Sequence, residues 1–356
     1  MAGTTIPLGK VSSAPMEPRP IAITLLGATG AIGRAVLEVL EDLDVPVGRV
    51  RLLATARSAG QEIDFRGGPL KVEVPSAEAF TGCDVAILMA GSEASRQWAP
   101  VARAAGCLVV DDSAAFRQEA DVPLAVPEVN GAALDGGAGL VANPSSMAIA
   151  LALALKPLHA AAGLARVVVS TYQAVSGAGH RGVEQLQREA SDLMNGREPP
   201  EPGRIRHRIA FNLVPQVGAL GADGVAEEEA VMARETRQLL GLPGLAISAT
   251  AVRVPVFYGH AAAVHVGFDR PLDAEAARQA LRQAPAVKLI DRPEEGVYPM
   301  PMLAVNDDAV LVGRVRADAA LVNGLALFLA VDNLRKGGPT NLVQLALAMV
   351  ERRRKP

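Results

Sequence analysis

Strand-like and helix-like spacings alternate through the first part of the chain. Ile21–Leu26 is a continuous apolar run, as expected of a strand buried on both faces. Residues 34–43 follow with apolar positions at the spacing of one helix face. Both patterns recur, with strands predicted over 49–54, 84–90 and 107–111 and the clearest helix over 94–105. This alternation predicts an α/β fold, a Rossmann-type doubly wound parallel sheet.

The pattern changes from Asn143 onward. An apolar helix is predicted over 147–156, where Pro157 should end it. Strands are then expected over 166–174, 204–211, 245–256 and 261–268, and helices over 183–195, 228–240, 274–283, 325–335 and 341–351. Such a mixture is typical of a second α+β domain with a mainly antiparallel sheet. We therefore expect a mobile tail over 1–20, a first domain over 21–145, a second over 146–324 and C-terminal helices over 325–356.

Composition narrows the class of protein. The 356 residues are 50% apolar and 21% charged, which allows a sizeable core. Lys and Arg total 35 against 38 Asp and Glu, so the net charge of −3 argues against a nucleic-acid partner. Two cysteines exclude a disulfide scaffold, and the histidines and cysteines lack metal-ligand spacing. Without a membrane-length apolar run or a signal-peptide pattern, a cytoplasmic protein with no membrane partner is expected.

A glycine motif directly after the first predicted strand indicates a dinucleotide site. Gly27, Gly30 and Gly33 are spaced Gly-x-x-Gly-x-x-Gly and open the first predicted helix. Glycine lets the backbone turn tightly against a pyrophosphate, and the helix N-terminus offers free N–H groups and partial positive charge. We expect cofactor contacts from Gly27, Thr29, Gly30, Ala31 and Ile32. The alternative is an ordinary strand–helix turn.

The end of the second predicted strand indicates which dinucleotide is bound. An NAD site usually has an acidic residue there that holds the ribose 2′-hydroxyl. Residues 54–58 contain no carboxylate, but they include Arg57 and Ser58, which suit a 2′-phosphate. The cofactor predicted is NADP, with a solvated surface arginine as the alternative interpretation of Arg57.

Nine sequence blocks are spread in order along nearly the whole chain: GATG at 27–30, RSAG at 57–60, DSAAFR at 112–117, VPEVN at 126–130, YQAVSGAG at 172–179, RVPV at 253–256, GH at 259–260, GRVR at 313–316 and DNLRKG at 332–337. Together they resemble the aspartate-semialdehyde dehydrogenase family. Enzymes of this family reduce aspartyl phosphate to aspartate semialdehyde and phosphate with NADPH. The resemblance implies a homodimer formed through the second domain, an amino-acid-like ligand and a C-terminal segment that returns to the first domain.

The chain departs from the family at the nucleophile. The family's chemistry uses a cysteine thiolate in an Asn-Pro-Asn-Cys motif at the start of a long helix, whereas residues 143–146 are Asn-Pro-Ser-Ser. The resemblance therefore puts Ser146 at the catalytic position. A helix N-terminus can populate a thiolate near neutral pH, but a serine hydroxyl needs a positioned base. An N-cap pair formed by Ser145 and Ser146 is the favoured alternative to a nucleophilic serine.

A second departure concerns phosphate. By the resemblance, the family's phosphate site uses an arginine, the asparagine before the cysteine and a lysine. Arg117 matches the arginine, but Ser145 and Val231 occupy the other two positions. Because phosphate recognition relies on charge-assisted hydrogen bonds, the loss of one cation should weaken it.

The resemblance also implies which pocket residues are kept. Gln173 would orient the substrate carbonyl, Arg253 would bind the substrate carboxylate, Glu228 would bind its amino group, and His260 would be the acid–base. Toward the cofactor, Ser176 and Gly177 would contact the nicotinamide side and Asn333 would approach from the C-terminal segment. The alternatives are a surface arginine, a solvated glutamate and a packed histidine.

Three interpretations of function remain. The first is a catalytically impaired relative, a pseudoenzyme candidate, that keeps NADP and amino-acid-like ligand binding. The second is an active NADP-dependent semialdehyde oxidoreductase of amino-acid biosynthesis that uses Ser146 or no covalent step. The third is a Cys→Ser variant of such an enzyme, against which Ser145 and Val231 argue.

Other polar candidates are assigned no function. Arg204, Arg206 and Arg208 would share one face of the predicted strand, where a wet surface is the more common outcome than an anion site. Cys83 and Cys107 lie at the N-terminal ends of predicted strands, away from the ligand-binding edge of the sheet, and are expected to be buried.

Overall fold

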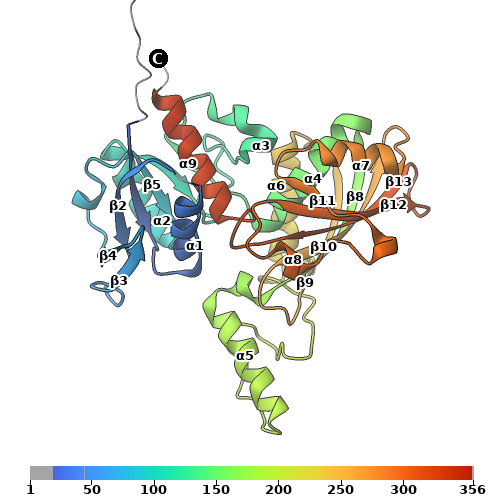
Figure 1. Ribbon diagram of the computed structural model, residues 1–356, viewed down its shortest axis with the longest axis horizontal. Helices are drawn as coiled ribbons and strands as arrows, with labels where there is room; N and C mark the ends of the chain where they lie inside the picture. The colour runs from blue at the N-terminus through green and yellow to red at the C-terminus, as the bar shows by residue number, and fades with distance from the viewer. Residues whose placement is uncertain (1–18, 44, 355–356) are drawn as a thin grey trace, which may run out of the picture.

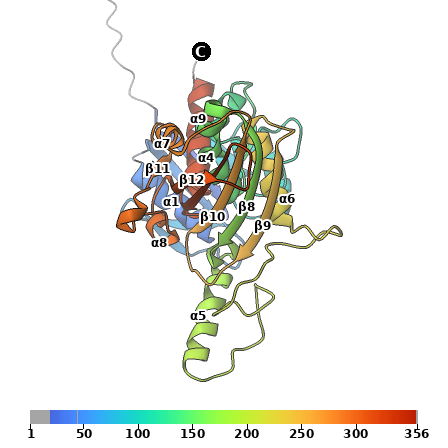
Figure 2. The same cartoon turned by 90° about the vertical axis from the view of Figure 1, so that its right-hand side faces the viewer.

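The computed structural model describes residues 19–43 and 45–354, so the predicted tail lies outside the described residues except for Arg19 and Pro20. Two lobes and one projecting arm are visible (Figure 1). The N-terminal lobe holds one sheet and the C-terminal lobe holds the other. The arm, which consists of helix α5 (His180–Met194) and the segment after it to residue 211, extends away from both (Figures 1 and 2).

The first domain contains the predicted doubly wound sheet. Its strands lie in the order β3-β4-β2-β1-β5-β6-β7, all parallel except the β3–β4 pair. Hydrophobic side chains of β1 and β5 fill its centre because these strands are covered on both faces. The elements are β1 (Ile21–Leu26), α1 (Ala31–Asp42), β2 (Val47–Leu53), β3 (Glu62–Phe65), β4 (Gly68–Glu73), β5 (Val85–Leu88), α2 (Ser92–Ala104), β6 (Leu108–Asp111), α3 (Pro127–Asn130) and β7 (Leu140–Ala142).

The second domain has the predicted mainly antiparallel sheet. Its strands lie in the order β11-β12-β13-β10-β8-β9, with β11–β12 and β8–β9 parallel and the other pairs antiparallel. The elements are α4 (Ser146–Ala162), β8 (Leu164–Gln173), α5 (His180–Met194), α6 (Glu227–Leu240), β9 (Ala246–Arg253), β10 (His260–Phe268), α7 (Ala274–Arg282), β11 (Val287–Leu289), α8 (Pro301–Ala304), β12 (Val310–Asp318), β13 (Gly324–Val331) and α9 (Pro339–Arg354).

Helix α4 is the central helix of the second domain, and it extends beyond its predicted end. Every residue from Met147 to Leu155 is at most 2% exposed. Pro157 lies inside the helix, which continues to Ala162. A proline removes one N–H donor, but burial of Leu158 and Ala162 stabilises the last turn enough to retain it. No helix among the described residues is long and apolar enough to cross a membrane.

Two other predicted elements are wrong. Most of the segment predicted as a helix over 325–335 is strand β13, which pairs with β10 and β12. A short apolar run does not distinguish a central strand from a buried helix. The predicted strand over 204–211 is irregular, because its backbone N–H groups bond to α5 side chains instead of a neighbouring strand. Gln185 Oε1 accepts from Ile205 N at 2.8 Å, and Glu189 Oε2 accepts from Ile209 N at 2.8 Å.

The segment after β13 joins the two domains. Arg335 bonds to Asp42 of the first domain at 2.7 Å and to Asp308 of the second at 2.7 Å. Lys336 is fully buried and donates to Glu128 of α3 and Gln344 of α9, both at 2.6 Å. Helix α9 then packs on α1 and beside the first sheet. These charged contacts fix the two lobes on either side of the crevice described below.

The buried Lys336–Glu128 pair gives a first prediction. Lys336→Met should lower the free energy of unfolding by about 3 kcal/mol, because it leaves a carboxylate without its counter-charge. Lys288→Met is the matched control, since Lys288 is 58% exposed and its pair with Asp307 should contribute no more than about 1 kcal/mol. Urea unfolding would measure both, and equal losses in the two variants would contradict the prediction.

Candidate active site

The turn between β1 and α1 can take only glycine at two positions. Gly27 has φ +95°, and a Cβ there would lie 2.8 Å from the Met89 carbonyl carbon. A Cβ on Gly33 would lie 2.4 Å from the Gly27 oxygen. Gly30 is the N-cap of α1 and has no side chain to cap it. The first-turn N–H groups of Ala31 and Ile32 thus have no intrahelical acceptor and are available to an anion.

The predicted nicotinamide contacts lie across a crevice from this turn. Ala31 and Ser176 line one cavity of about 270 Å³ between the two domains. Ser176 Oγ donates to Asn333 Oδ1 at 3.0 Å, so these two predicted contacts adjoin each other. The tight glycine turn and the uncapped helix end fit the pyrophosphate of a dinucleotide, whose bound nicotinamide would supply hydride chemistry.

The predicted 2′-phosphate residues follow β2 on the chain. Arg57 is exposed just beyond β2. Ser58 Oγ accepts from Thr29 Oγ1 at 3.5 Å, which places the hydroxyl pair beside the glycine turn. No carboxylate follows β2 within residues 54–58.

All six predicted catalytic and substrate residues line one cavity of about 220 Å³, which we call the inner cavity. It lies where α4 begins, between the two sheets, and it also contacts the cofactor turn through Ile32. Its lining includes Arg117, Ser145, Ser146, Gln173, Gly177, Glu228, Arg253 and His260. The geometry therefore brings together side chains from the loop after β6, α4, β8, α6, β9 and β10.

His260 presents a proton donor to this cavity. The imidazole is 3% exposed, and its Nδ1 accepts the Ala174 backbone N–H at 3.2 Å. In the neutral ring the proton must then be on Nε2. Burial and, secondly, the charge of Arg253 lower the pKa of His260 to about 3. The residue is thus neutral near pH 7 and donates a hydrogen bond instead of accepting a proton.

Arg253 and Glu228 supply opposite charges at one end of the inner cavity. The Arg253 guanidinium donates to the Ala174 carbonyl at 2.7 Å, which fixes its position. A Cβ on Gly177 would lie 2.7 Å from Arg253 Nη1 and 3.0 Å from His260 Nε2, so a larger residue there would displace the Arg253 guanidinium. Gln173 Nε2 donates to Glu228 Oε1 at 3.2 Å, and burial raises the pKa of Glu228.

Ser145 and Ser146 begin helix α4. Ser145 occupies the N-cap position, but its side chain makes no capping hydrogen bond, so the predicted N-cap pair is not formed through Ser145. Its Oγ is buried and has no hydrogen-bond partner among the described residues. Ser146 is the first helical residue, and a Cβ on Gly337 would lie 3.4 Å from its Cβ.

Arg117 is held by neighbouring acceptors. It donates to the Asp112 carbonyl at 2.7 Å and to Glu235 at 3.4 Å. Glu235 is fully buried and also accepts the Ser145 N–H at 2.7 Å. Burial raises the pKa of Asp112 to about 6, although the charge of Arg117 opposes this shift.

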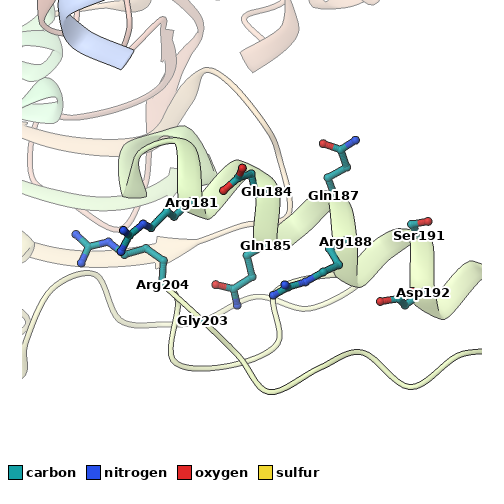
Figure 3. A pocket seen from close by; sticks show the side chains of 9 residues that line it. All are labelled: Arg181, Glu184, Gln185, Gln187, Arg188, Ser191, Asp192, Gly203 and Arg204. Atoms are coloured by element: carbon teal, nitrogen blue, oxygen red, sulfur yellow. The ribbon is translucent and has the colours of Figure 1, made fainter. Parts of the chain in front are cut away.

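Val231 lies outside the inner cavity but lines a neighbouring one of about 540 Å³, which we call the outer cavity. Arg117, Gly177, Val217, Glu228 and Arg253 line both cavities. The outer cavity is completed largely by the arm and the loop that follows it, including Arg204, Arg206 and His207. A larger groove runs along α5 and shares only Arg204 with the outer cavity (Figure 3).

Sequence reasoning missed several contributors to the site. Glu235 is seven residues after Glu228 on α6, a spacing that returns to the same helix face and could have revealed it. Asp112 follows β6 at the ligand-binding edge of the sheet. Gly337 and the arginines of the arm reach the site only through tertiary packing. No group of described residues has the geometry of a metal site.

Two family comparisons agree with this geometry. Residues 22–136 match the family model described as "Semialdehyde dehydrogenase, NAD binding domain", and residues 155–336 match "Semialdehyde dehydrogenase, dimerisation domain". The fold and the site therefore define the class as proteins of the semialdehyde dehydrogenase type. These have two domains, and the first domain binds a nicotinamide dinucleotide.

Individual relatives define the family more closely. The chain is 41% identical over 332 residues to aspartate-semialdehyde dehydrogenase of Aquifex aeolicus, covering 92% of this chain and 98% of that protein. It is 41% identical to the Synechocystis protein of the same name, covering 94% and 99%. The crystal structure of aspartate semialdehyde dehydrogenase II complexed with ASA from Vibrio cholerae is 38% identical with a TM-score of 0.90, covering 94% and 99%. The chain belongs to the aspartate-semialdehyde dehydrogenase family.

The buried imidazole gives a second prediction. The unfolded state takes up a proton on His260 near pH 6.5, whereas the folded state does so only near pH 3. Stability must therefore fall as the pH drops through this window. Relative to His260→Asn, whose Oδ1 can still accept the Ala174 N–H, the unaltered protein should lose about 2 kcal/mol between pH 6.5 and 4.5. Urea unfolding across this range would test it, and parallel pH profiles would refute it.

Proposed function

We propose that this protein binds NADP(H) and an aspartate-semialdehyde-like amino acid, and that its dehydrogenase activity is strongly impaired. The observation that carries the proposal is Ser146, which lines the inner cavity with Gln173, Arg253 and His260 where the family has its cysteine. In the cytoplasm, where we expect it, such a protein would bind the ligands of the pathway enzyme without comparable turnover.

The impairment follows from proton chemistry at Ser146. A serine must lose its proton as it attacks, because its hydroxyl is far less acidic than a thiol. His260 cannot accept that proton while its Nδ1 is occupied by the Ala174 N–H and its Nε2 carries the ring proton. An Nε2–H donor still suits a substrate carbonyl oxygen. The site is thus better suited to ligand binding than to acyl transfer.

Ligand binding rests on the remaining charged groups. Arg253 is suited to the ligand carboxylate because its fork matches carboxylate geometry. Glu228 would accept from the amino group, and Gln173 would orient the carbonyl. Arg117 retains one phosphate-binding cation, but Val231 supplies no second. Weak phosphate binding should accompany the loss of the nucleophile.

The cofactor preference for NADP over NAD rests on Arg57 and Ser58. Ser58 accepts a hydrogen bond from Thr29 of the cofactor turn, and the segment after β2 lacks the carboxylate that would hold a 2′-hydroxyl. A guanidinium and a hydroxyl favour a 2′-phosphate. Ser176, Gly177 and Asn333 would contact the nicotinamide end.

A homodimer is the proposed assembly. The second domain matches a family dimerisation domain, and one face of its sheet exposes apolar side chains. Val168 and Tyr172 both lie on that face of β8, and their exposed fractions are 41% and 38%. Burial of this face against a second copy would remove these apolar side chains from water.

Activity provides a third prediction. With aspartate semialdehyde, phosphate and NADP⁺, the unaltered protein should show no turnover above background, measured as NADPH absorbance. Ser146→Cys alone should restore little activity, and Ser146→Cys with Val231→Lys should restore at least tenfold more, because nucleophile and phosphate cation are then both present. Ser145→Cys with Val231→Lys is the control with the thiol one residue away. Turnover of the unaltered protein at about 1 s⁻¹ or faster would overturn the impairment.

Cofactor preference provides a fourth prediction. Arg57→Ala should weaken NADPH binding about tenfold and leave NADH binding nearly unchanged, because only NADPH carries the 2′-phosphate. Fluorescence titration of each reduced cofactor measures this difference. Arg51→Ala, which removes a guanidinium earlier on β2 that bonds to the carbonyls of Glu78 and Ala79, controls for a general charge effect. An equal loss for both cofactors in Arg57→Ala would remove the assignment.

A further inference from the structure

The outer cavity extends beyond the side chains assigned above to the amino acid and to phosphate. The inner cavity of about 220 Å³ is smaller than the roughly 300–1,000 Å³ typical of ligand pockets. The adjoining outer cavity is about 540 Å³. Its walls carry Arg204, Arg206 and His207 in addition to residues shared with the inner cavity.

The arm holds these cations in place. Ile205, between Arg204 and Arg206, is buried and bonds to Gln185 through its N–H at 2.8 Å and its carbonyl at 3.0 Å. Gln185 is itself buried and donates to Glu189 at 2.8 Å. The exposed arginines are therefore carried by a backbone segment that is fixed to α5 and is not a free loop.

In the part of the chain that the structure describes, two cations of this cavity lack ion pairs, whereas Arg117 pairs with Glu235 at 3.4 Å and the carboxylates of Glu227 and Glu228 line the wall beside Arg253. Among the described residues, neither Arg204 nor Arg206 forms a salt bridge. Arg204 instead donates to the Ala178 carbonyl at 3.4 Å. Burial, and in smaller part the charge of Arg204, lower the pKa of Arg253, although Glu228 opposes this. Guanidinium groups that repel each other across a cavity favour an anionic occupant.

The shared residues show where the outer cavity joins the inner one. Glu228 and Arg253 line both, whereas Ser146, Gln173 and His260 line only the inner cavity. The outer cavity therefore opens from the end proposed for the ligand's amino and carboxylate groups. A carboxylate cannot carry an extension and keep its charge, but the amino nitrogen can carry an acyl group.

We propose that the outer cavity binds an acidic substituent on the ligand's amino nitrogen, so that the preferred ligand is an N-acyl amino acid whose acyl chain ends in a carboxylate. Arg253 holds the inner carboxylate, Glu228 accepts from the amide N–H, and Arg204 and Arg206 bind the outer carboxylate. This inference rests on the proposed function, because it uses the roles assigned there to Arg253 and Glu228.

The test compares two acylated ligands that differ only at the end of the acyl chain, which is a methyl group in one and a carboxylate in the other. L-Asparagine supplies an uncharged side-chain carbonyl, and its N-butanoyl and N-succinyl derivatives carry acyl chains of equal length without and with a terminal carboxylate. Isothermal titration calorimetry of the full chain with NADP at low salt should show the N-succinyl compound binding about tenfold more tightly than the N-butanoyl compound. In Arg204→Gln with Arg206→Gln this preference should fall to about twofold or less.

Two controls separate a defined site from diffuse charge. Arg208→Gln changes an exposed arginine of the same segment that does not line the outer cavity, and it should keep the preference. Unchanged NADPH affinity in the double variant shows that the fold is retained. This inference is overturned if the unaltered protein binds the two derivatives equally, or if Arg208→Gln loses as much of the N-succinyl preference as the double variant. In either case, binding of asparagine still supports the proposed function. If none of the three compounds binds, the proposed function fails as well.

Discussion

The crossing segment from Asp332 to Gly338 is the constraint on which the site depends. Its charged residues connect the lobes, since Arg335 reaches carboxylates on both sides and Lys336 is buried against α3 and α9. Its uncharged residues then form part of the crevice. Asn333 bonds to Ser176, and Gly337 passes against the first turn of α4. A shift of this segment would separate the cofactor turn from Ser146.

Burial sets the protonation of the imidazole in the inner cavity. His260 is the family's acid–base residue by resemblance, yet its surroundings keep it neutral and fix its proton on the side that faces the cavity. Glu235 stabilises the start of α4 by accepting the Ser145 N–H, a favourable position for a carboxylate at a helix N-terminus. Ser145 and Ser146, at the same helix start, contribute hydroxyls and no thiol to the inner cavity.

Local patterns predicted those features that depend on local physics. The turn at Gly27 follows from backbone sterics, and β1, β2, β5 and β6 follow from apolar runs, so these features were visible in the sequence, whereas β3, β4 and β7 were not predicted. Strand β13 could not be recognised from the sequence, because its apolar run is equally compatible with a buried helix and its partners lie far away in the chain. The path of the arm was missed for a related reason, since side chains of α5 replace a partner strand there.

The arm has consequences for how such a protein can diversify. It has its own small apolar cluster, which includes Leu186, Ile205 and Ile209, and its own polar clamp at Gln185. Its folding therefore makes few demands on the two sheets that carry the crevice. Exchange of the outer part of this arm could change ligand length, provided that His180 and Val183, which line the cofactor crevice, are kept.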